Sequence, residues 1–404
     1  MKYFGLGLWL LVNLAWAETK ECPAPDALNH YVTRADGGYA GPVKIYYRLL
    51  KAYNPKLPTL LIINGGPGGN HQIINHFEEY SKFANIVGFD HRGLSCTSFL
   101  GVPHLEHYAA HMYSMEKAAQ DIEAIRKDLI GDEKWFVYGL SYGTMLGQQY
   151  VTDFSKSVRG IILDSAFHDG SFALPIARDQ YFPLFIESNP ETNALYQQVI
   201  ALYPDAKEHI PSKIWQGTYN YYGRTVKIPN FLRQILSAKT KEEAAKIYTF
   251  ETFPTVGMQR EILCEEIWDF PTSPGVIFPM LFTDCATIAK FRKPMNFTEA
   301  LKKLKVPMMI WGGAFDPATP IQAMREIQRL TPDSFLFENK YAGHGIAMEK
   351  PQCALALADA FLKSETKAKF EAIAKSDDCQ SPPASKTDQA QTFEDFVGVK
   401  NSFL

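Results

Sequence analysis

Three polar side chains spread along the chain have the types and the order needed for nucleophilic catalysis: Ser141, Asp316 and His344. Ser141 lies in the pentapeptide Gly-Leu-Ser-Tyr-Gly (139–143), directly after an apolar run. A serine hydroxyl is a poor nucleophile near neutral pH, so it needs a base to take its proton and an acid to orient that base. His344 is the candidate base and Asp316 the candidate orienting acid. We therefore expect Ser141 to attack a carbonyl carbon and form an acyl-enzyme.

Glycine is expected to be required on either side of Ser141 for steric reasons. A serine held on a strained turn between a strand and a helix exposes its hydroxyl, and side chains at positions 139 and 143 would clash with the neighbouring strand and helix. The alternative is a buried serine in a tight strand–helix turn, with no chemistry attached to it.

The candidate base and acid each follow a predicted strand of their own. Asp316 comes just after the run 306–311, and His344 just after the run 334–338. Open α/β sheets build their sites at the carboxyl ends of the strands, so the two side chains are expected to meet there. Alone, such an aspartate is usually a cap and such a histidine is usually structural. The triad rests on their order and their placement together.

An acyl-transfer site also needs two backbone N–H groups for the developing oxyanion. The residue after the nucleophile, Tyr142, would supply one, and Gly66 in the glycine-rich loop 64–69 would supply the other. The alternative for this loop is a simple glycine-rich turn. A phosphate-binding loop is disfavoured because no Gly-Lys-Ser or Gly-Lys-Thr follows it.

The surrounding pattern alternates strands and helices, which predicts a parallel sheet with helices on both faces. The strands are expected at 43–50, 59–63, 85–89, 135–138, 160–163, 306–311 and 334–338, with helices over 115–130 and from 145 to 150. The fold class is therefore α/β, with a mostly parallel central sheet. A region rich in aromatic residues and proline interrupts this rhythm, and it is expected to be a mainly helical lid inserted in the sheet domain.

These patterns divide the chain into five parts. They are a signal peptide (1–17), a first part of the core (18–166), the lid (167–300), a second part of the core (301–375) and a C-terminal tail (376–404).

The first residues predict export to the periplasm or beyond the cell. Lys2 precedes the apolar run 4–14, and Ala15-Trp16-Ala17 fits a cleavage site after Ala17. A membrane anchor is the alternative, but the run is too short to span a bilayer comfortably. The even number of cysteines suits up to three disulfides, whose pairing the sequence leaves open; they are Cys22, Cys96, Cys264, Cys285, Cys353 and Cys379.

Several partners are not expected. A net charge of −3, without a basic run, argues against nucleic acid. After removal of the signal peptide no segment is long and apolar enough for a membrane. His104, His107 and His111 have a spacing that could bind a metal on a helix, but the HExxH pattern is absent, so no metal and no cofactor are predicted.

Taken together, these motifs resemble those of the proline iminopeptidase family of α/β-hydrolases, a family of serine aminopeptidases. The resemblance covers about residues 40–165 and 300–360, and it includes the segment Asp-His-Arg-Gly-Leu-Ser at 90–95. Asn64 stands where that family usually has His, and this departure looks more like its exported tripeptidyl-aminopeptidase branch. The resemblance implies Ser141 as nucleophile, His344 as base, and a lid that binds the α-ammonium group of a small peptide.

Glu265 and Glu266 are the lid carboxylates expected to bind that ammonium group. A desolvated carboxylate favours substrates with a free N-terminus, because it forms charge-assisted hydrogen bonds with the ammonium group. The alternative is an acidic pair in solvent. The predicted function is an exported serine aminopeptidase that releases one or more N-terminal residues. An esterase or amidase with the same triad, and a non-catalytic binding protein on the same scaffold, are the competing hypotheses.

Overall fold

The computed structural model describes residues 22–35, 41–100, 113–217, 223–249, 266 and 295–382. Within these ranges nine strands form one sheet, in the order β1-β2-β4-β3-β6-β7-β8-β9, with β5 beside β2. The strands are β1 (Asn29–Arg34), β2 (Val43–Leu49), β3 (Thr59–Ile63), β4 (Asn85–Phe89), β5 (Ser98–Phe99), β6 (Trp135–Leu140), β7 (Val158–Asp164), β8 (Met308–Gly313) and β9 (Phe335–Asn339).

The sheet is mixed but mostly parallel, as the sequence predicts. β1, β4 and β5 pair with β2 in the antiparallel sense, and every pair from β4 through β3 to β9 is parallel. The parallel strands β3, β4, β6 and β8 are buried along their whole length. Their continuous apolar sequences follow from helices covering both faces.

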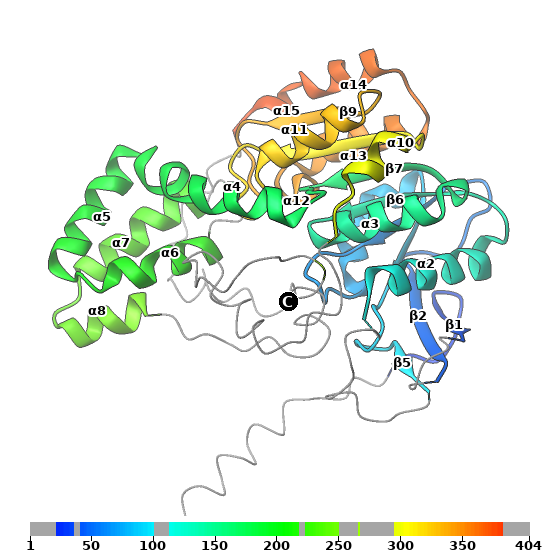
Figure 1. Cartoon of the computed structure of the whole chain (residues 1–404), viewed down its shortest axis with the longest axis horizontal. Coiled ribbons are helices and arrows are strands. Elements are labelled where there is room, and N and C mark those ends of the chain that lie inside the picture. The colour runs from blue at the N-terminus through cyan, green and yellow to red at the C-terminus, as the bar shows by residue number, and fades with distance from the viewer. Residues whose placement is uncertain are drawn as a thin grey trace, which may run out of the picture.

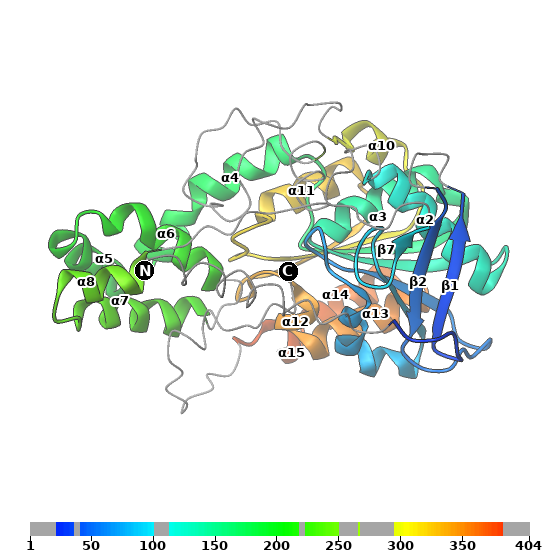
Figure 2. The same ribbon diagram turned by 90° about the horizontal axis from the view of Figure 1, so that it is seen from below.

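Helices pack on the two faces of the sheet as separate layers (Figure 2). One face carries α2 (Met115–Ile130), α3 (Tyr142–Asp153), α10 (Thr298–Lys303) and α11 (Ile321–Leu330). The other carries η1 (His71–Lys82), α12 (Ile346–Glu349), α13 (Pro351–Leu362) and α14 (Lys367–Ala374), with α15 (Asp377–Gln380) beyond them. The helix expected from residue 145 begins at Tyr142, because Ser141 already occupies the N-cap position.

One strand boundary differs from the predicted one for a physical reason, and two short strands were not predicted. The run 306–311 becomes β8 only from Met308, since Pro307 has no N–H to give to a ladder; its carbonyl accepts the Ile161 N–H instead (2.9 Å). β1 and the two-residue β5 lack a long apolar run, and no strand is predicted for either.

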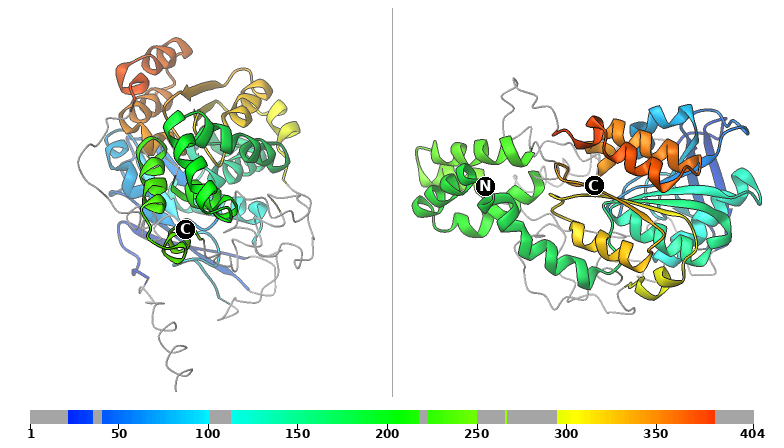
Figure 3. Two further views of the ribbon diagram at one scale, coloured as in Figure 1. Left: turned by 90° about the vertical axis from the view of Figure 1, so that its left-hand side faces the viewer. Right: turned by 90° about the horizontal axis from the view of Figure 1, so that it is seen from above.

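Between β7 and β8 the chain leaves the sheet and forms a group of helices at one end of the molecule (Figures 1 and 3). They are α4 (Gly170–Phe182), η4 (Pro183–Glu187), α5 (Pro190–Leu202), α6 (Ala206–Gly217), η5 (Gly223–Lys227), α7 (Ile228–Leu236) and α8 (Lys241–Tyr248). The apolar core of the α2/α3/α11 face continues into α5 and α7. The predicted signal peptide (1–17) and most of the predicted tail lie outside the described residues.

Two disulfides join distant parts of the described chain. Cys22 pairs with Cys96, and Cys353 pairs with Cys379, which fixes α15 against α13. Cys264 and Cys285 lie outside the described residues. None of the described helices combines the length and the apolar character that crossing a bilayer requires.

Candidate active site

Ser141 sits on a sharp turn between β6 and α3. Its backbone has φ 54° and ψ −122°, a region that residues with a side chain rarely adopt. A Cβ on Gly139 would lie 2.3 Å from the Gly143 carbonyl oxygen, and one on Gly143 would lie 2.3 Å from the Ile63 carbonyl oxygen. Both contacts are far below van der Waals distance. The expected clash with helix and strand is therefore confirmed, and only glycine fits at either position.

His344 and Asp316, which are 28 residues apart in the sequence, meet at the carboxyl ends of β9 and β8. The Nδ1 atom of His344 lies 2.9 Å from each carboxylate oxygen of Asp316. Asp316 also accepts the Thr319 hydroxyl (2.6 Å) and the backbone N–H groups of Ala318 and Thr319. The Asp316 side chain is fully buried, whereas that of His344 keeps 12% of its surface exposed. The histidine is thus the member of the pair that can reach a substrate.

The electrostatics of this pair favour its charged form. Burial alone would raise the pKa of Asp316, but the nearby imidazole and the hydrogen bonds from His344 and Thr319 outweigh it and lower that pKa. For His344, burial would lower the pKa, but the Asp316 charge and hydrogen bond raise it above the usual value. The two directions agree, since each partner stabilises the charge of the other.

Asp164, at the end of β7, connects the serine turn to the histidine loop. Its backbone carbonyl accepts the Ser141 N–H (3.0 Å). Its carboxylate accepts the N–H groups of Ile346 (2.7 Å) and Ala347 (2.9 Å) and the Tyr138 hydroxyl (2.7 Å). Asp164 is not among the residues predicted from the sequence. The signal was an aspartate at the end of an apolar strand, next in the sheet to the strand of the nucleophile.

The neighbouring Ser165 strengthens this connection. Its hydroxyl accepts the Gly345 N–H at 2.7 Å. A Cβ on Gly345 would lie 3.4 Å from Leu140 Cδ1, so the residue after His344 adjoins the residue before Ser141. The structure thus brings the segments of all three predicted triad residues to the same edge of the sheet.

The glycine-rich loop after β3 lies against Ser141. A Cβ on Gly65 would lie 3.2 Å from Ser141 Cβ and 3.8 Å from its hydroxyl oxygen. Gly66 has φ +122°, and a Cβ there would lie 2.6 Å from the Gly68 nitrogen, so a side chain is excluded. The Asn64 side chain holds the loop by accepting the Gly65 N–H (2.7 Å) and donating to the Asn70 carbonyl (3.1 Å).

Tyr142 occupies the first position of α3, where the backbone N–H has no acceptor within the helix. Its ring is buried, and burial, with a smaller contribution from the charge of Glu266, raises the pKa of the hydroxyl well above its usual value. Of the two residues predicted to supply oxyanion donors, Tyr142 directly follows Ser141, and Gly66 directly follows Gly65, which lies against Ser141.

Glu266 lies in the interior, with 2% of its surface exposed. Its Oε2 accepts the Met115 N–H (2.9 Å) at the beginning of α2, where Ser114 caps the helix by accepting the Lys117 N–H. A carboxylate at this end is also favoured by the helix dipole. The alternative of an acid in solvent is thus wrong for Glu266. Glu265 lies outside the described residues.

Arg92, in the segment 90–95, is buried and makes a bidentate ion pair with Asp121 of α2 (2.8 Å for both hydrogen bonds). This pair fastens the loop after β4 to the helix layer. In the described ranges no group of three His, Cys, Asp or Glu side chains is placed to hold a metal ion. His104, His107 and His111 lie outside those ranges.

Fold and sequence comparisons agree on the class of protein. Residues 58–216 match the family described as alpha/beta hydrolase fold, and residues 278–372 match the family described as TAP-like protein. The chain is an α/β-hydrolase with a TAP-like segment toward its C-terminus.

Proline iminopeptidases and a serine protease are among the proteins with similar sequences, and the homology is distant. The proline iminopeptidase of Saccharolobus solfataricus is 25% identical over 280 residues, which cover 69% of this chain and 76% of that protein. Serine protease Hip1 of Mycobacterium tuberculosis is 30% identical over 178 residues, 33% of either chain. Among solved structures, proline iminopeptidase from Mycobacterium smegmatis (TM-score 0.51, 15% identity) and VinJ (TM-score 0.50, 16% identity) each align over 85% of this chain and 100% of their own. At such identities these two structures show the fold alone.

Proposed function

We propose that this α/β-hydrolase is an exported serine aminopeptidase that cleaves short peptides near their N-terminus through an acyl-enzyme. The observation that carries the proposal is the His344–Asp316 pair, held by the same strand end that fixes the turn of Ser141. Distant homology to proline iminopeptidases and to a serine protease supports a peptide as substrate. The disulfides Cys22–Cys96 and Cys353–Cys379 support an oxidising compartment, and with it the predicted export.

In the proposed mechanism Asp316 holds the Nδ1 atom of His344, so Nε2 is the basic nitrogen that takes the Ser141 proton. The serine oxygen attacks the scissile carbonyl carbon, and the negative charge that develops on the carbonyl oxygen rests on the N–H groups of Gly66 and Tyr142. His344 then gives its proton to the leaving amine, and the acyl-enzyme forms. Water, activated by the same histidine, hydrolyses the ester and frees Ser141.

The helices α4 to α8 belong to the predicted lid (167–300), which would admit small peptides and keep bulk water from the acyl-enzyme. Glu266, and with it Glu265, is proposed to bind the α-ammonium group of the substrate. In support, Glu266 is buried and its charge acts on Tyr142, the residue that follows the nucleophile.

One observation favours the competing esterase or amidase hypothesis. The Glu266 carboxylate already accepts the Met115 N–H, so it can be explained as a cap that ties the lid to α2. In that case no group would select for a free N-terminus, and the triad would act on blocked substrates equally well.

Anilide substrates distinguish these hypotheses. A prolyl anilide and a tripeptidyl anilide, each with a free or an acetylated amine, would be compared for kcat/KM. We expect cleavage of the free amines and at least a tenfold loss on acetylation, the effect of leaving one buried charge unpaired (about 1.4 kcal/mol or more). Equal rates on both forms would refute the aminopeptidase.

The variant Glu266→Gln sharpens this comparison, because it keeps the shape of the side chain. It should weaken the free-amine substrates selectively and leave the acetylated ones unchanged. An equal loss on both would identify Glu266 as a structural cap.

A further inference from the structure

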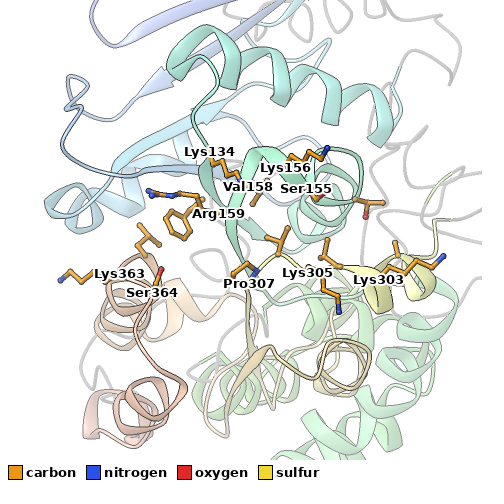
Figure 4. A pocket seen from close by; sticks show the side chains of 16 residues that line it. Lys134, Ser155, Lys156, Val158, Arg159, Lys303, Lys305, Pro307, Lys363 and Ser364 are labelled. Atoms are coloured by element: carbon orange, nitrogen blue, oxygen red, sulfur yellow. The ribbon is translucent and has the colours of Figure 1, made fainter.

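A hollow lies at the edge of the sheet where β6, β7 and β8 begin (Figure 4). It has a volume of about 970 Å³, and it is bounded by the segments that enter β6, β7 and β8 and by the ends of α3, α10 and α13. β6 separates it from the nucleophile, since Lys134 precedes this strand and Ser141 follows it. Six strand residues span about 20 Å, so a ligand in the hollow would not touch the triad.

The lining of the hollow has one sign of charge. Six of its side chains are cationic, and no aspartate or glutamate lines it; the cations are Lys134, Lys156, Arg159, Lys303, Lys305 and Lys363. The chain as a whole carries a net charge of −3, so this concentration of positive charge does not reflect the composition. The cations come from both halves of the sheet domain, and Figure 4 shows them spread around the hollow.

Helix dipoles explain only part of this charge. Lys303 ends α10, and Lys363 follows α13 and pairs with Asp359 (2.7 Å), so both have a structural role at a helix C-terminus. Lys134, Arg159 and Lys305 lie at strand entries, outside any helix. All three are exposed, and within the described parts of the chain no carboxylate forms an ion pair with them. Arg159 lies over the Phe136 ring (5.8 Å), which holds its guanidinium group on the wall of the hollow.

We propose that this hollow binds an extended polyanion that carries repeated phosphate groups. Lysine and arginine side chains around one depression match several successive negative charges, and the hydroxyls of Ser155 and Ser364 add donors for phosphate oxygens. The volume is large for a single phosphate ion and lies in the range of sites for larger ligands.

A membrane surface fits the hollow less well. The large apolar side chains that are most exposed in the described ranges, Leu100, Phe172 and Leu202, do not line it, so no apolar anchor accompanies the charge. Single-stranded nucleic acid fits poorly too, because Phe136, the aromatic residue of the lining, is buried and offers no face for a base.

The probe for this proposal is inorganic polyphosphate, added to the full chain at low salt, with binding followed by calorimetry. We expect saturable binding that weakens steeply as salt is added. The variant with Lys134→Gln, Arg159→Gln and Lys305→Gln should bind at least tenfold more weakly, on the order expected for three exposed charge contacts. Its anilide kinetics and melting temperature should remain unchanged.

The matched control neutralises three exposed lysines elsewhere, with Lys51→Gln, Lys56→Gln and Lys241→Gln. It has the same net charge as the first variant and should bind polyphosphate like the parent chain. Equal losses in both variants, or no binding by the parent chain, would overturn the proposal. So would binding to phosphatidylglycerol vesicles or to polyglutamate that depends on Lys134, Arg159 and Lys305 while polyphosphate does not bind.

Discussion

Two buried aspartates lie beside the histidine loop, and their surroundings give them opposite properties. Asp316 contacts the imidazole of His344 at 2.9 Å, and its pKa is lowered. Asp164 accepts hydrogen bonds from Tyr138 and from two backbone N–H groups of the same loop, but its pKa is raised, because burial outweighs these neutral donors. Residue type and burial are the same, and the partner makes the difference.

The two carboxylates thus have different roles: Asp316 takes part in the proposed chemistry, and Asp164 stabilises the fold around it. Asp316 contacts His344, which gains a positive charge during the proposed reaction. Asp316 is therefore expected to stabilise the transition state. Asp164 accepts hydrogen bonds from backbone N–H groups that stay neutral throughout the reaction. It is therefore expected to stabilise the folded protein. Removing the two carboxylates should therefore damage different properties of the protein.

The largest effect is expected from Asp316→Asn. The amide keeps the shape of the side chain but favours the wrong tautomer of His344 and loses the charge that stabilises the imidazolium form. We expect kcat/KM on the anilide to fall about 10⁴-fold. The melting temperature should fall much less than in Asp164→Asn. Near-normal activity with a lowered melting temperature would give Asp316 the supporting role instead.

Asp164→Asn should show the reverse pattern. Its amide group would place a donor against the N–H of Ile346 or Ala347, so the free energy of unfolding should fall by about 1–3 kcal/mol. Activity at low temperature, measured on the folded fraction, should fall far less than in Asp316→Asn. If Asp164→Asn were instead the less active of the two while still folded, the assignment of roles would be wrong.

The pH dependence of the reaction sharpens the same contrast. The proposed base must be neutral to act, and Asp316 raises the pKa of His344 above 6.5. We expect kcat/KM to fall tenfold per pH unit on the acidic side, with a midpoint above pH 6.5. In Asp316→Asn the residual activity should have its midpoint at lower pH, whereas Asp164→Asn should lower the midpoint less, because the Asp164 charge contributes less than Asp316 to the raised pKa of His344. A parent midpoint well below pH 6.5 would contradict the ion pair.

The ion pair between His344 and Asp316 should contribute to the free energy of unfolding within a limited pH range. The contribution from His344 is complete below its unfolded pKa of 6.5 and is lost as the pH rises through the raised folded value. The contribution from Asp316 is present above its unfolded pKa of 3.8 and is lost as the pH falls through the lowered folded value. Denaturant melts across this range would check both signs.

The smallest effect is expected from Tyr138→Phe, which removes one neutral donor (2.7 Å) from Asp164. The free energy of unfolding should fall by about 1 kcal/mol, with kcat/KM almost unchanged. Tyr80→Phe is the matched control, since the buried Tyr80 hydroxyl has no hydrogen-bond partner in the described ranges. Equal destabilisation by both substitutions would show that the Tyr138 hydrogen bond gives no support to Asp164.

The sequence predicted the parts of the site that carry local signals. The serine turn is marked by two glycines that nothing else could replace. The strand before Asp316 is a continuous apolar run of the kind buried in parallel sheets, and the strand before His344 begins with the shorter apolar run 335–337. Their positions at strand ends therefore followed from the sequence, and the fold with them.

Other features depend on long-range contacts that local signals do not reveal. Asp164 stands at the end of an apolar strand, but its role depends on hydrogen bonds to residues about 180 positions away. The contact between Glu266 and the beginning of α2 spans 151 residues in the same way. The basic hollow collects lysines that look, one at a time, like ordinary surface residues between helices and strands. Such features arise only when the sheet order brings distant segments together.

The most direct measurement of the central claim is labelling of the full chain with a fluorophosphonate, read by mass spectrometry of its peptides. If His344 activates Ser141, each protein molecule should carry one phosphonyl group, on Ser141. The variant His344→Ala should slow the labelling by several orders of magnitude. Labelling that is absent from Ser141, or that proceeds as fast without His344, would contradict the proposed triad.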